Sequence, residues 1–379
     1  MNRNNYIVTR YHVIILCLCF IFGISHTAIW AQVPHVKLVY EAFISDTSDT
    51  KACHASTIVK AGKNTLVAAW FGGAYEGSAD VSIWLARNEG KGWQKPMFVA
   101  DGKGADGKQY ACWNPVLFLA ADGVLYLHYK VGVNPREWWA MYKTSTDKGL
   151  SWSVARALPE GFLGPVKNKP LQLDKQTVLY PSSVESSDEK SWTVHVETSG
   201  SKLQQWKKIN INNDTFQAIQ PSFLDYGNAR LQLLARSKQN VIVQSWSGDG
   251  GNTWSKLAKT SLPNPNSGID AATINNSLHV LVYNPLVAGK DWWEGRSVLK
   301  VAASKDGIIW TDIYTLENET KGEYSYPAVI ADKDGDVYIT YTHDRRQIKF
   351  VQLKVDGVKN EQTACYLSEK GKVIADKKP

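Results

Sequence analysis

Ser247-Gly248-Asp249-Gly250-Gly251-Asn252-Thr253-Trp254 carries the fold signal from which the rest of the chain can be read. The Asp249 carboxylate can cap a turn, and the two glycines after it tolerate a positive φ. Trp254 can then pack its ring against the sheet behind the turn. The stretch therefore predicts a tight hairpin between two strands.

Weaker copies of this turn recur along the chain at a regular interval. The copy that starts at Asp147 keeps the five-residue step to tryptophan, the copy at Asp306 is one residue shorter, and the first copy has Asn88 in place of aspartate. The tryptophans that end the units are 48 to 59 residues apart, at Trp93, Trp152, Trp206, Trp254 and Trp310. A fixed period of this length is typical of a repeat architecture.

Six such units follow one another, and each holds about four short strand patterns. Units of this size and content predict an all-β fold, a six-bladed β-propeller, in which each blade packs on its neighbours. The last unit lacks an aspartate turn, so we expect the segment Val36–Phe43 to supply its missing strand and close the ring. The clearest second strands of the units are Thr65–Trp70, Val124–Tyr129, Leu231–Ala235, Leu278–Tyr283 and Val337–Tyr341.

The first strand of each unit opens on polar residues. In a propeller the innermost strands begin at one face, and the loops that join second to third strands reach the same face. Side chains from these two places in all blades are therefore expected to converge on one central pocket, unless they merely hydrate the axial channel. The openings are Cys53–Thr57, Cys112–Pro115, Lys167–Pro170, Gln220–Ser222, Asn266–Asp270 and Tyr324–Pro327.

Both ends of the chain differ in composition from the repeats. Arg3 and Arg10 precede the apolar run Val13–Gly23, and Ala31 offers a cleavage site, which is the pattern of a signal peptide. An uncleaved membrane anchor is the alternative. We expect a signal peptide over 1–31, an N-terminal strand and linker over 32–50, the propeller over 51–357 and a C-terminal tail over 358–379. The protein is predicted to be exported, periplasmic or secreted, without stable membrane insertion once the signal is removed.

Charge and cysteine content limit the partners and the chemistry. The formal net charge of +7 falls to +5 without residues 1–31, because two arginines and no acid are removed. No basic run precedes the lysine-rich tail, so we expect an acidic glycan as partner rather than nucleic acid, and a monomer. No zinc spacing, phosphate loop or nucleophile elbow occurs, so neither metal nor cofactor is expected. Cys53 and Cys112 open successive units and could form one disulfide or stay as buried thiols.

With these turns, the chain resembles the sialidase superfamily, and within it the bacterial and plant predicted neuraminidases with BNR, or Asp-box, repeats. The resemblance covers Lys51 to about Leu353. It implies three arginines that bind the substrate carboxylate, an aspartate as acid/base, a tyrosine nucleophile and a glutamate that takes the tyrosine proton. A neutral tyrosine suits a sugar with its own carboxylate, because that carboxylate repels an anionic nucleophile.

The resemblance assigns three residues and leaves others unmatched. Asp80 falls where the acid/base aspartate is expected, although it could simply cap its turn. Tyr324, followed by serine, matches the nucleophile, and Arg236 matches one carboxylate-binding arginine. Gln220 stands roughly where the glutamate is expected, and Asp270 begins the blade in which another arginine is expected. The first arginine is also missing, because blade one opens with His54 and its neighbours.

The remaining polar residues still predict a pocket for an acidic sugar. Positive charge would come from Lys167, Lys169, Arg236, Arg136 and Arg345, and Asn114 would line the same pocket. Proton-transfer groups would be His54, Asp80, Glu76 and Tyr324. A histidine and a tyrosine among cations also suit β-elimination at a uronic acid, in which a base removes the C5 proton and an acid protonates the leaving oxygen.

Three functions are consistent with these residues. The first is an exo-acting sialidase-like glycoside hydrolase that removes a terminal acidic sugar, with Asp80 as acid/base and Tyr324 as nucleophile. The second is a uronate-directed lyase or rhamnosidase that uses His54. The third is a propeller that binds acidic glycans without catalysis, since this fold serves several activities.

Overall fold

The computed structural model describes residues 33–45, 49–200, 202–275, 277–291 and 293–356. The predicted signal peptide and the predicted C-terminal tail lie outside these residues. Every named element is a β-strand, and all of the strands belong to the unit Pro34–Pro379. Within the described ranges no helix is long and apolar enough to cross a membrane.

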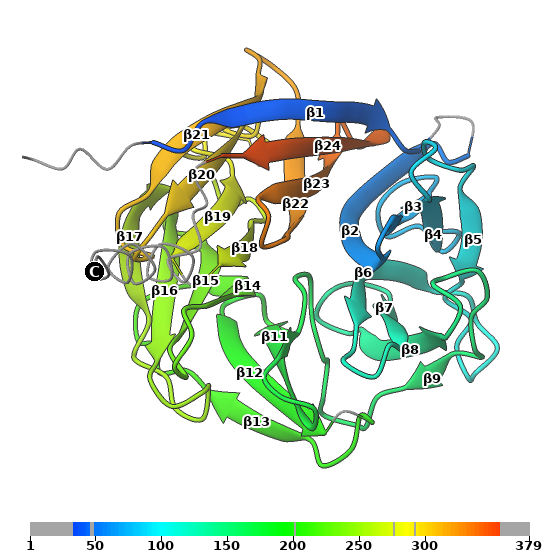
Figure 1. The fold of residues 1–379 in the computed structure, drawn as a ribbon. Helices are drawn as coiled ribbons and strands as arrows, with labels where there is room; N and C mark the ends of the chain where they lie inside the picture. The colour runs from blue at the N-terminus through cyan, green and yellow to red at the C-terminus, as the bar shows by residue number, and fades with distance from the viewer. Residues whose placement is uncertain (1–32, 46–48, 201, 276, 292, 357–379) are drawn as a thin grey trace, which may run out of the picture. The chain divides into compact units, whose positions relative to one another are not determined.

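The strands of this unit form six four-stranded antiparallel sheets around a central axis, which is a six-bladed β-propeller (Figure 1). The first blade contains β2 (Ala52–Gly62), β3 (Thr65–Gly73), β4 (Ser82–Asn88) and β5 (Met97–Ala100). The second contains β6 (Ala111–Leu119), β7 (Leu125–Gly132), β8 (Trp139–Ser145) and β9 (Arg156–Ala157). The third contains β10 (Leu171–Gln172), β11 (Thr177–Glu185), β12 (Trp192–Gly200) and β13 (Lys207–Asn210).

The second half of the ring repeats the same order from the inside outward. The fourth blade contains β14 (Ala218–Asp225), β15 (Leu231–Ser237), β16 (Val241–Ser247) and β17 (Ala258–Pro263). The fifth contains β18 (Asp270–Asn275), β19 (Leu278–Tyr283), β20 (Val298–Ser304) and β21 (Thr311–Asn318). The sixth contains β22 (Tyr324–Ala331), β23 (Asp336–His343), β24 (Gln347–Val355) and β1 (Val36–Phe43).

The two ends of the chain meet in the sixth blade, where β1 pairs antiparallel with β24. The strand predicted over Val36–Phe43 is therefore confirmed, with the same bounds. Figure 1 shows β1 beside β24 on the outer side of this blade. The pairing covers an edge of β24 that would otherwise be exposed.

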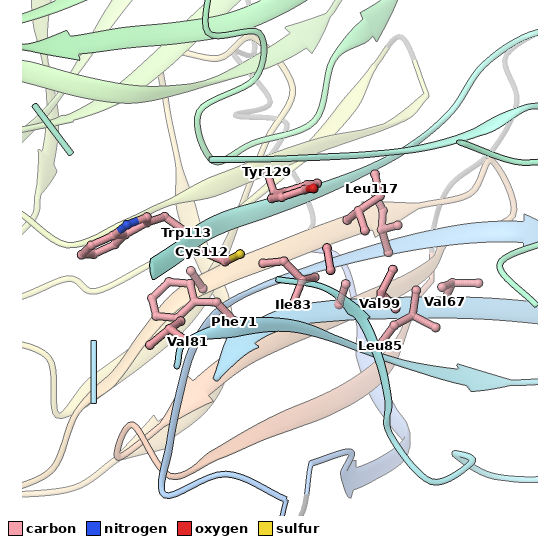
Figure 2. Packing of buried hydrophobic residues seen from close by; sticks show 14 of the residues in the cluster. Val67, Phe71, Val81, Ile83, Leu85, Val99, Cys112, Trp113, Leu117 and Tyr129 are labelled. Atoms are coloured by element: carbon pink, nitrogen blue, oxygen red, sulfur yellow. The ribbon is translucent and has the colours of Figure 1, made fainter. Parts of the chain in front are cut away.

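Apolar layers between neighbouring blades hold the ring together. Between the first two blades, Figure 2 shows Phe71, Ile83 and Leu85 in one cluster with Cys112, Leu117 and Tyr129. All six are buried. The middle strands are buried on both faces because each blade packs between two others, and this explains their long apolar runs.

The serine–aspartate turns close the outer hairpins as their residues suggest. Asp249 Oδ1 accepts hydrogen bonds from Ser247 Oγ (2.8 Å) and from the Thr253 N–H (2.9 Å). Gly251 has a φ of 88°, and its N–H donates to Ser247 Oγ (2.9 Å). The turn at Asp147 has the same set of bonds, since Ser145 Oγ and the Ser151 N–H donate to it. These turns lie in the hairpins that lead to the outermost strands of their blades, whereas the openings begin the inner strands.

The innermost strands of four blades share a β-bulge near their start. In each, two residues face one residue of the second strand, and the first of the two has a positive φ: Ala55 (52°), Asn114 (41°), Gln220 (56°) and Tyr326 (52°). In the second, fourth and sixth blades the residue with positive φ is followed by a proline. Proline suits a bulge because it cannot donate a hydrogen bond to the neighbouring strand. Positive φ is rare for such residues and is tolerated only where surrounding structure imposes it.

Candidate active site

His54, Tyr326 and Arg236 lie together where the bulged strands begin. The rings of His54 and Tyr326 are in contact, with centroids 4.2 Å apart. Arg236, near the end of β15, donates from Nη1 to the Tyr326 hydroxyl oxygen over 2.7 Å. All three come from different blades, so the bulges and strand ends of the first, fourth and sixth blades build one site.

Two further arginines join this cluster through one carboxylate. Arg296 donates from Nη1 to Glu323 Oε1 (2.9 Å), and Arg345 donates from Nε to Glu323 Oε2 (2.8 Å). Burial by itself raises the pKa of the Glu323 carboxyl, but the hydrogen bond from Arg345 and the two positive charges outweigh it, so this pKa lies below its ordinary value. Arg345 also pairs with Glu76.

His54 is neutral at physiological pH because of where it lies. Its side chain is buried, and burial lowers its pKa well below the ordinary value. The positive charges of Arg345, Arg296, Arg236 and Lys167 lower that pKa further. Neither ring nitrogen has a hydrogen-bond partner among the described residues. His54 is therefore an uncharged base that faces a cationic cluster.

The lysines of the third opening lie on the axis. Lys167 Nζ donates to the carbonyl oxygens of Ile269 (3.0 Å) and Pro327 (2.6 Å), so it ties the third blade to the fifth and sixth. Burial lowers the pKa of Lys167 to about 7. Lys169 instead forms an ion pair with the buried Asp270. Asp270 also accepts from Ser222 Oγ (2.8 Å), which makes it a structural anchor of the inner strands.

The loops at the mouth of the site carry the other predicted residues. Glu76 lies in the loop between β3 and β4, where it reaches Arg345. Asp80, in the same loop, is exposed, and its Oδ2 accepts the Ala74 N–H (3.0 Å). Arg136, between β7 and β8, pairs with Glu189 of the third blade (2.7 Å). Asp80 thus caps its own loop, the alternative role that its sequence context also suggested.

Tyr324 is not part of the cluster around His54. Its ring packs among buried residues of the fifth and sixth blades and lies 4.8 Å from the ring of His343. Burial and the nearby carboxylates of Asp344, Glu317 and Glu319 raise its pKa. In a regular strand, side chains two positions apart point to the same face, so Tyr324 and Tyr326 would lie on one face. The bulge at Tyr326 breaks this alternation, and Tyr326 contacts His54 and Arg236 instead.

Other predicted lining residues lie around the axis. Asn114 and Gln220 are both buried at the bulges of their blades. Gln220 Oε1 has no hydrogen-bond partner among the described residues. The space beside His54 is a pocket of about 20 Å³ lined by Phe71, Glu76 and Arg345 among others. That volume admits about one water molecule.

A wider cavity of about 330 Å³ lies further along the inner strands, where Lys169, Ser222 and Asp270 line it. The cysteines of the openings do not bond to each other: Cys53 and Cys112 are buried free thiols. Burial raises the pKa of Cys53 to about 12. No group of three metal-binding side chains is present in the part of the chain that the structure describes.

Sequence reasoning missed three members of the cluster: Tyr326, Arg296 and Glu323. Tyr326 precedes proline as Asn114 and Gln220 do, and this shared pattern was a usable signal. Glu323 immediately precedes the sixth opening. Arg296 lies in the long connection between β19 and β20, which carries no repeat signature, so nothing in the sequence pointed to it.

The chain matches the family model for the BNR repeat-like domain over residues 64–339. No curated protein sequence matches it significantly. Among solved structures, a protein of unknown function from Dyadobacter fermentans shares 14% identity at a TM-score of 0.68, covering 85% of this chain and 100% of its own. A Hadza microbial sialidase shares 15% identity at a TM-score of 0.67, and the match covers 83% of this chain and 68% of the sialidase. A Trypanosoma rangeli sialidase in complex with the inhibitor DANA shares 14% identity at a TM-score of 0.60, and the match covers 84% of this chain and 57% of that sialidase. At these identities the likeness establishes the fold alone.

Proposed function

Because the chain belongs to the family of BNR repeat-like domains and folds as a sialidase-type propeller, we propose that it is an exported, exo-acting glycosidase that removes a terminal acidic sugar from glycans. The observation that carries the proposal is the cluster of Arg236, Arg296 and Arg345 around the buried His54 and the half-buried Tyr326. Arg236 and Arg296 are buried, and a buried cation is costly unless a negative charge lies close to it.

The arginines are suited to bind the carboxylate of the substrate. Guanidinium groups donate two parallel hydrogen bonds to a planar carboxylate, which fixes both its position and its orientation. Glu323 already holds Arg296 and Arg345 in place, and Tyr326 contacts Arg236. In the bound state, the substrate carboxylate replaces Glu76 on Arg345, and the Glu76 loop moves aside.

Tyr326 is the nucleophile that this geometry favours. The hydrogen bond from Arg236 stabilises negative charge as it develops on the phenolic oxygen. His54 accepts the phenolic proton while the oxygen attacks the anomeric carbon, and the glycosidic oxygen leaves with a proton from an acid. Water then releases the sugar with retained configuration. Tyr324 as nucleophile and Asp80 as acid/base stay predictions from the sequence that the tests below separate.

Incubation with sialylated oligosaccharides tests the hydrolase directly. We expect release of the free acidic sugar by the wild type, and a loss of about 10²-fold or more in kcat/KM for Arg236→Met and Arg296→Met, because each variant removes a charge that contacts the carboxylate or positions its neighbours. A matched control is the exposed Arg156→Met, which lies in the outer strand β9. Binding of acidic glycans without any product would instead favour a non-catalytic propeller.

A uronate-directed lyase or rhamnosidase is the second candidate, and the unpartnered, neutral imidazole of His54 favours it. In the lyase form His54 removes the C5 proton, the arginines stabilise the enolate-like carboxylate, and the C4–O bond breaks with its electron pair on the leaving oxygen. A new ultraviolet absorbance of an unsaturated uronate on rhamnosyl-glucuronate substrates identifies this reaction. Hydrolysis of the same substrates without that absorbance identifies the rhamnosidase.

Export is part of the proposal and rests on residues 1–31. A protein produced with its own N-terminus and recovered outside the cytoplasm is expected to begin near Gln32. Mass spectrometry of the intact protein measures this, and a mass that retains residues 1–31 would contradict cleavage.

A further inference from the structure

One carboxyl group at the mouth of the arginine cluster has no role in the mechanism above. Glu185 ends β11 and is paired in register with Trp192 at the start of β12. Side chains alternate along a strand, so Glu185 shares its face with Ser183, whose hydroxyl accepts the Gln220 N–H (3.0 Å). Glu185 thus lies on the face of β11 that contacts the start of the fourth blade.

Cations from two neighbouring blades face Glu185. Arg136 comes from the second blade, and Arg236 and Lys238 come from the fourth; all three act electrostatically on the Glu185 carboxyl. Arg236 and Lys238 lie over the Trp192 ring, at 5.4 Å and 4.2 Å from its centroid. Arg236 also donates to the Tyr326 hydroxyl, so the same arginine acts on Glu185 through its charge and on the proposed nucleophile through a hydrogen bond.

Burial dominates the ionisation of this carboxyl. Glu185 is half-buried, and the burial raises its pKa. Arg236, Arg136, Lys238 and a hydrogen bond with Trp192 lower that pKa, but not enough to cancel the burial. A carboxyl whose pKa is raised keeps its proton to a higher pH than an ordinary glutamate, and this suits a group that donates a proton in catalysis.

We propose that Glu185 is the general acid that protonates the leaving oxygen of the substrate, an assignment that rests on the proposed function. The carboxyl proton moves to the glycosidic oxygen while the C–O bond breaks and its electron pair stays on that oxygen, which leaves as an alcohol. In hydrolysis the Glu185 carboxylate then takes a proton from the attacking water; in elimination solvent reprotonates it. Both reactions need this proton, so the assignment holds for either.

Asp80 is the alternative acid, and its surroundings differ. It is exposed and bonded to the backbone of its own loop, whereas Glu185 is half-buried and under the electrostatic influence of the arginine that contacts Tyr326. A group that donates a proton in the transition state contributes about 10²- to 10⁴-fold to the rate. The two carboxyls can therefore be separated by kinetics.

The test uses the full protein and two substrates with the same acidic sugar, one with a natural sugar leaving group and one with an activated aryl leaving group. Glu185→Gln is expected to lower kcat on the sugar leaving group by about 10²- to 10⁴-fold and to affect the aryl substrate far less, because a good leaving group needs no proton. The variant should also lose the basic limb of the pH profile. Glu137→Gln, exposed in a loop of the same face, serves as control.

Three outcomes would overturn the assignment. An equal loss on both substrates would make Glu185 a structural residue, and an unchanged rate would exclude it. A leaving-group-dependent loss in Asp80→Asn instead would give the role to Asp80. If Glu185→Gln does not fold, Glu185→Asp is the second variant, because it keeps a carboxyl group on a shorter side chain. It should lower kcat on the sugar leaving group more than kcat on the aryl leaving group. A wild type without turnover on either substrate would refute the proposed function itself, which distinguishes the two failures.

Discussion

At the scale of single residues, the bulge at Tyr326 decides which tyrosine reaches the site. Tyr324 and Tyr326 are two positions apart and would share one face of a regular strand. The positive φ of Tyr326 breaks that regularity, so Tyr324 packs among the buried residues and Tyr326 contacts His54 and Arg236. A backbone strain of this kind is held only by surrounding structure and is often found at functional sites.

Substitution of the two tyrosines separates them. Tyr326→Phe is expected to lower kcat by about 10³-fold or more, because it removes the nucleophilic hydroxyl while keeping the ring next to His54. Tyr324→Phe is expected to keep near wild-type kcat, since the ring still fills its place between the blades. Steady-state release of the acidic sugar measures both. The reverse result would restore Tyr324, the nucleophile expected from the sequence.

Buried histidines make the fold sensitive to acid. Burial lowers the pKa of His128 to about 3, with a further lowering by Lys130, whereas an unfolded histidine titrates near 6.5. Below pH 6.5 the unfolded chain binds a proton that the native chain does not, so the free energy of unfolding falls as the pH falls. Above pH 6.5 both states are neutral and this contribution disappears.

His128→Phe is therefore expected to stabilise the protein in acid. The ring of His128 lies among those of Tyr126, Tyr142 and Tyr180, where phenylalanine fits. At pH 5, about 1.5 units below the pKa of an unfolded histidine, the free energy of unfolding of the variant should exceed that of the wild type by about 2 kcal/mol. Each of these pH units contributes about 1.4 kcal/mol. Denaturant unfolding at pH 5 and pH 8 measures the difference, and the exposed His35→Phe is the control. An equal effect at both pH values would contradict the linkage.

At the scale of elements, the serine–aspartate turns stabilise blades and have no part in the chemistry. Asp249→Ala removes the acceptor of three hydrogen bonds, from Ser247 and from the backbone and hydroxyl of Thr253. We expect the midpoint of thermal unfolding to fall by a few degrees while kcat stays unchanged. Calorimetry measures the midpoint, and the exposed Asp334→Ala is the matched control. A loss of kcat with unchanged stability would place this turn in the site.

The loop between β3 and β4 contributes Glu76, whose carboxylate pairs with Arg345 of the cluster. Glu76→Ala leaves Arg345 paired with Glu323 but removes the carboxylate with which a ligand has to compete. We expect acidic ligands to bind about tenfold more tightly, which corresponds to about 1.4 kcal/mol. Calorimetric titration with a sialic acid measures this affinity, and a neutral sugar is the control ligand. Weaker binding would mean that Glu76 itself contacts the substrate.

At the scale of the whole propeller, the ring depends on strands from both ends of the described chain. The β1–β24 ladder contains seven residue pairs. A chain that begins at Ile44 should lose roughly 5 kcal/mol or more of unfolding free energy, because these hydrogen bonds and the burial under β1 are lost together. Denaturant unfolding and size-exclusion chromatography measure stability and association through the exposed edge of β24. A chain that begins at Val33 is the control, and equal stability of the two would contradict this closure.

The periodic turns determined the blade count, the strand pairs and the closing strand, because hairpins depend on short stretches whose residues are adjacent in sequence. The sequence alone also predicted that the openings would contribute to a site, and His54 and Tyr326 of the candidate site lie in two of them. Only the tertiary structure decided which residues meet. The bulge brings Tyr326 of the sixth opening to His54, and Glu323 binds Arg296 and Arg345, which lie outside the openings. The physical reason is that the local backbone conformation is encoded by neighbours in sequence, whereas charge, burial and pKa at the axis depend on all the blades at once.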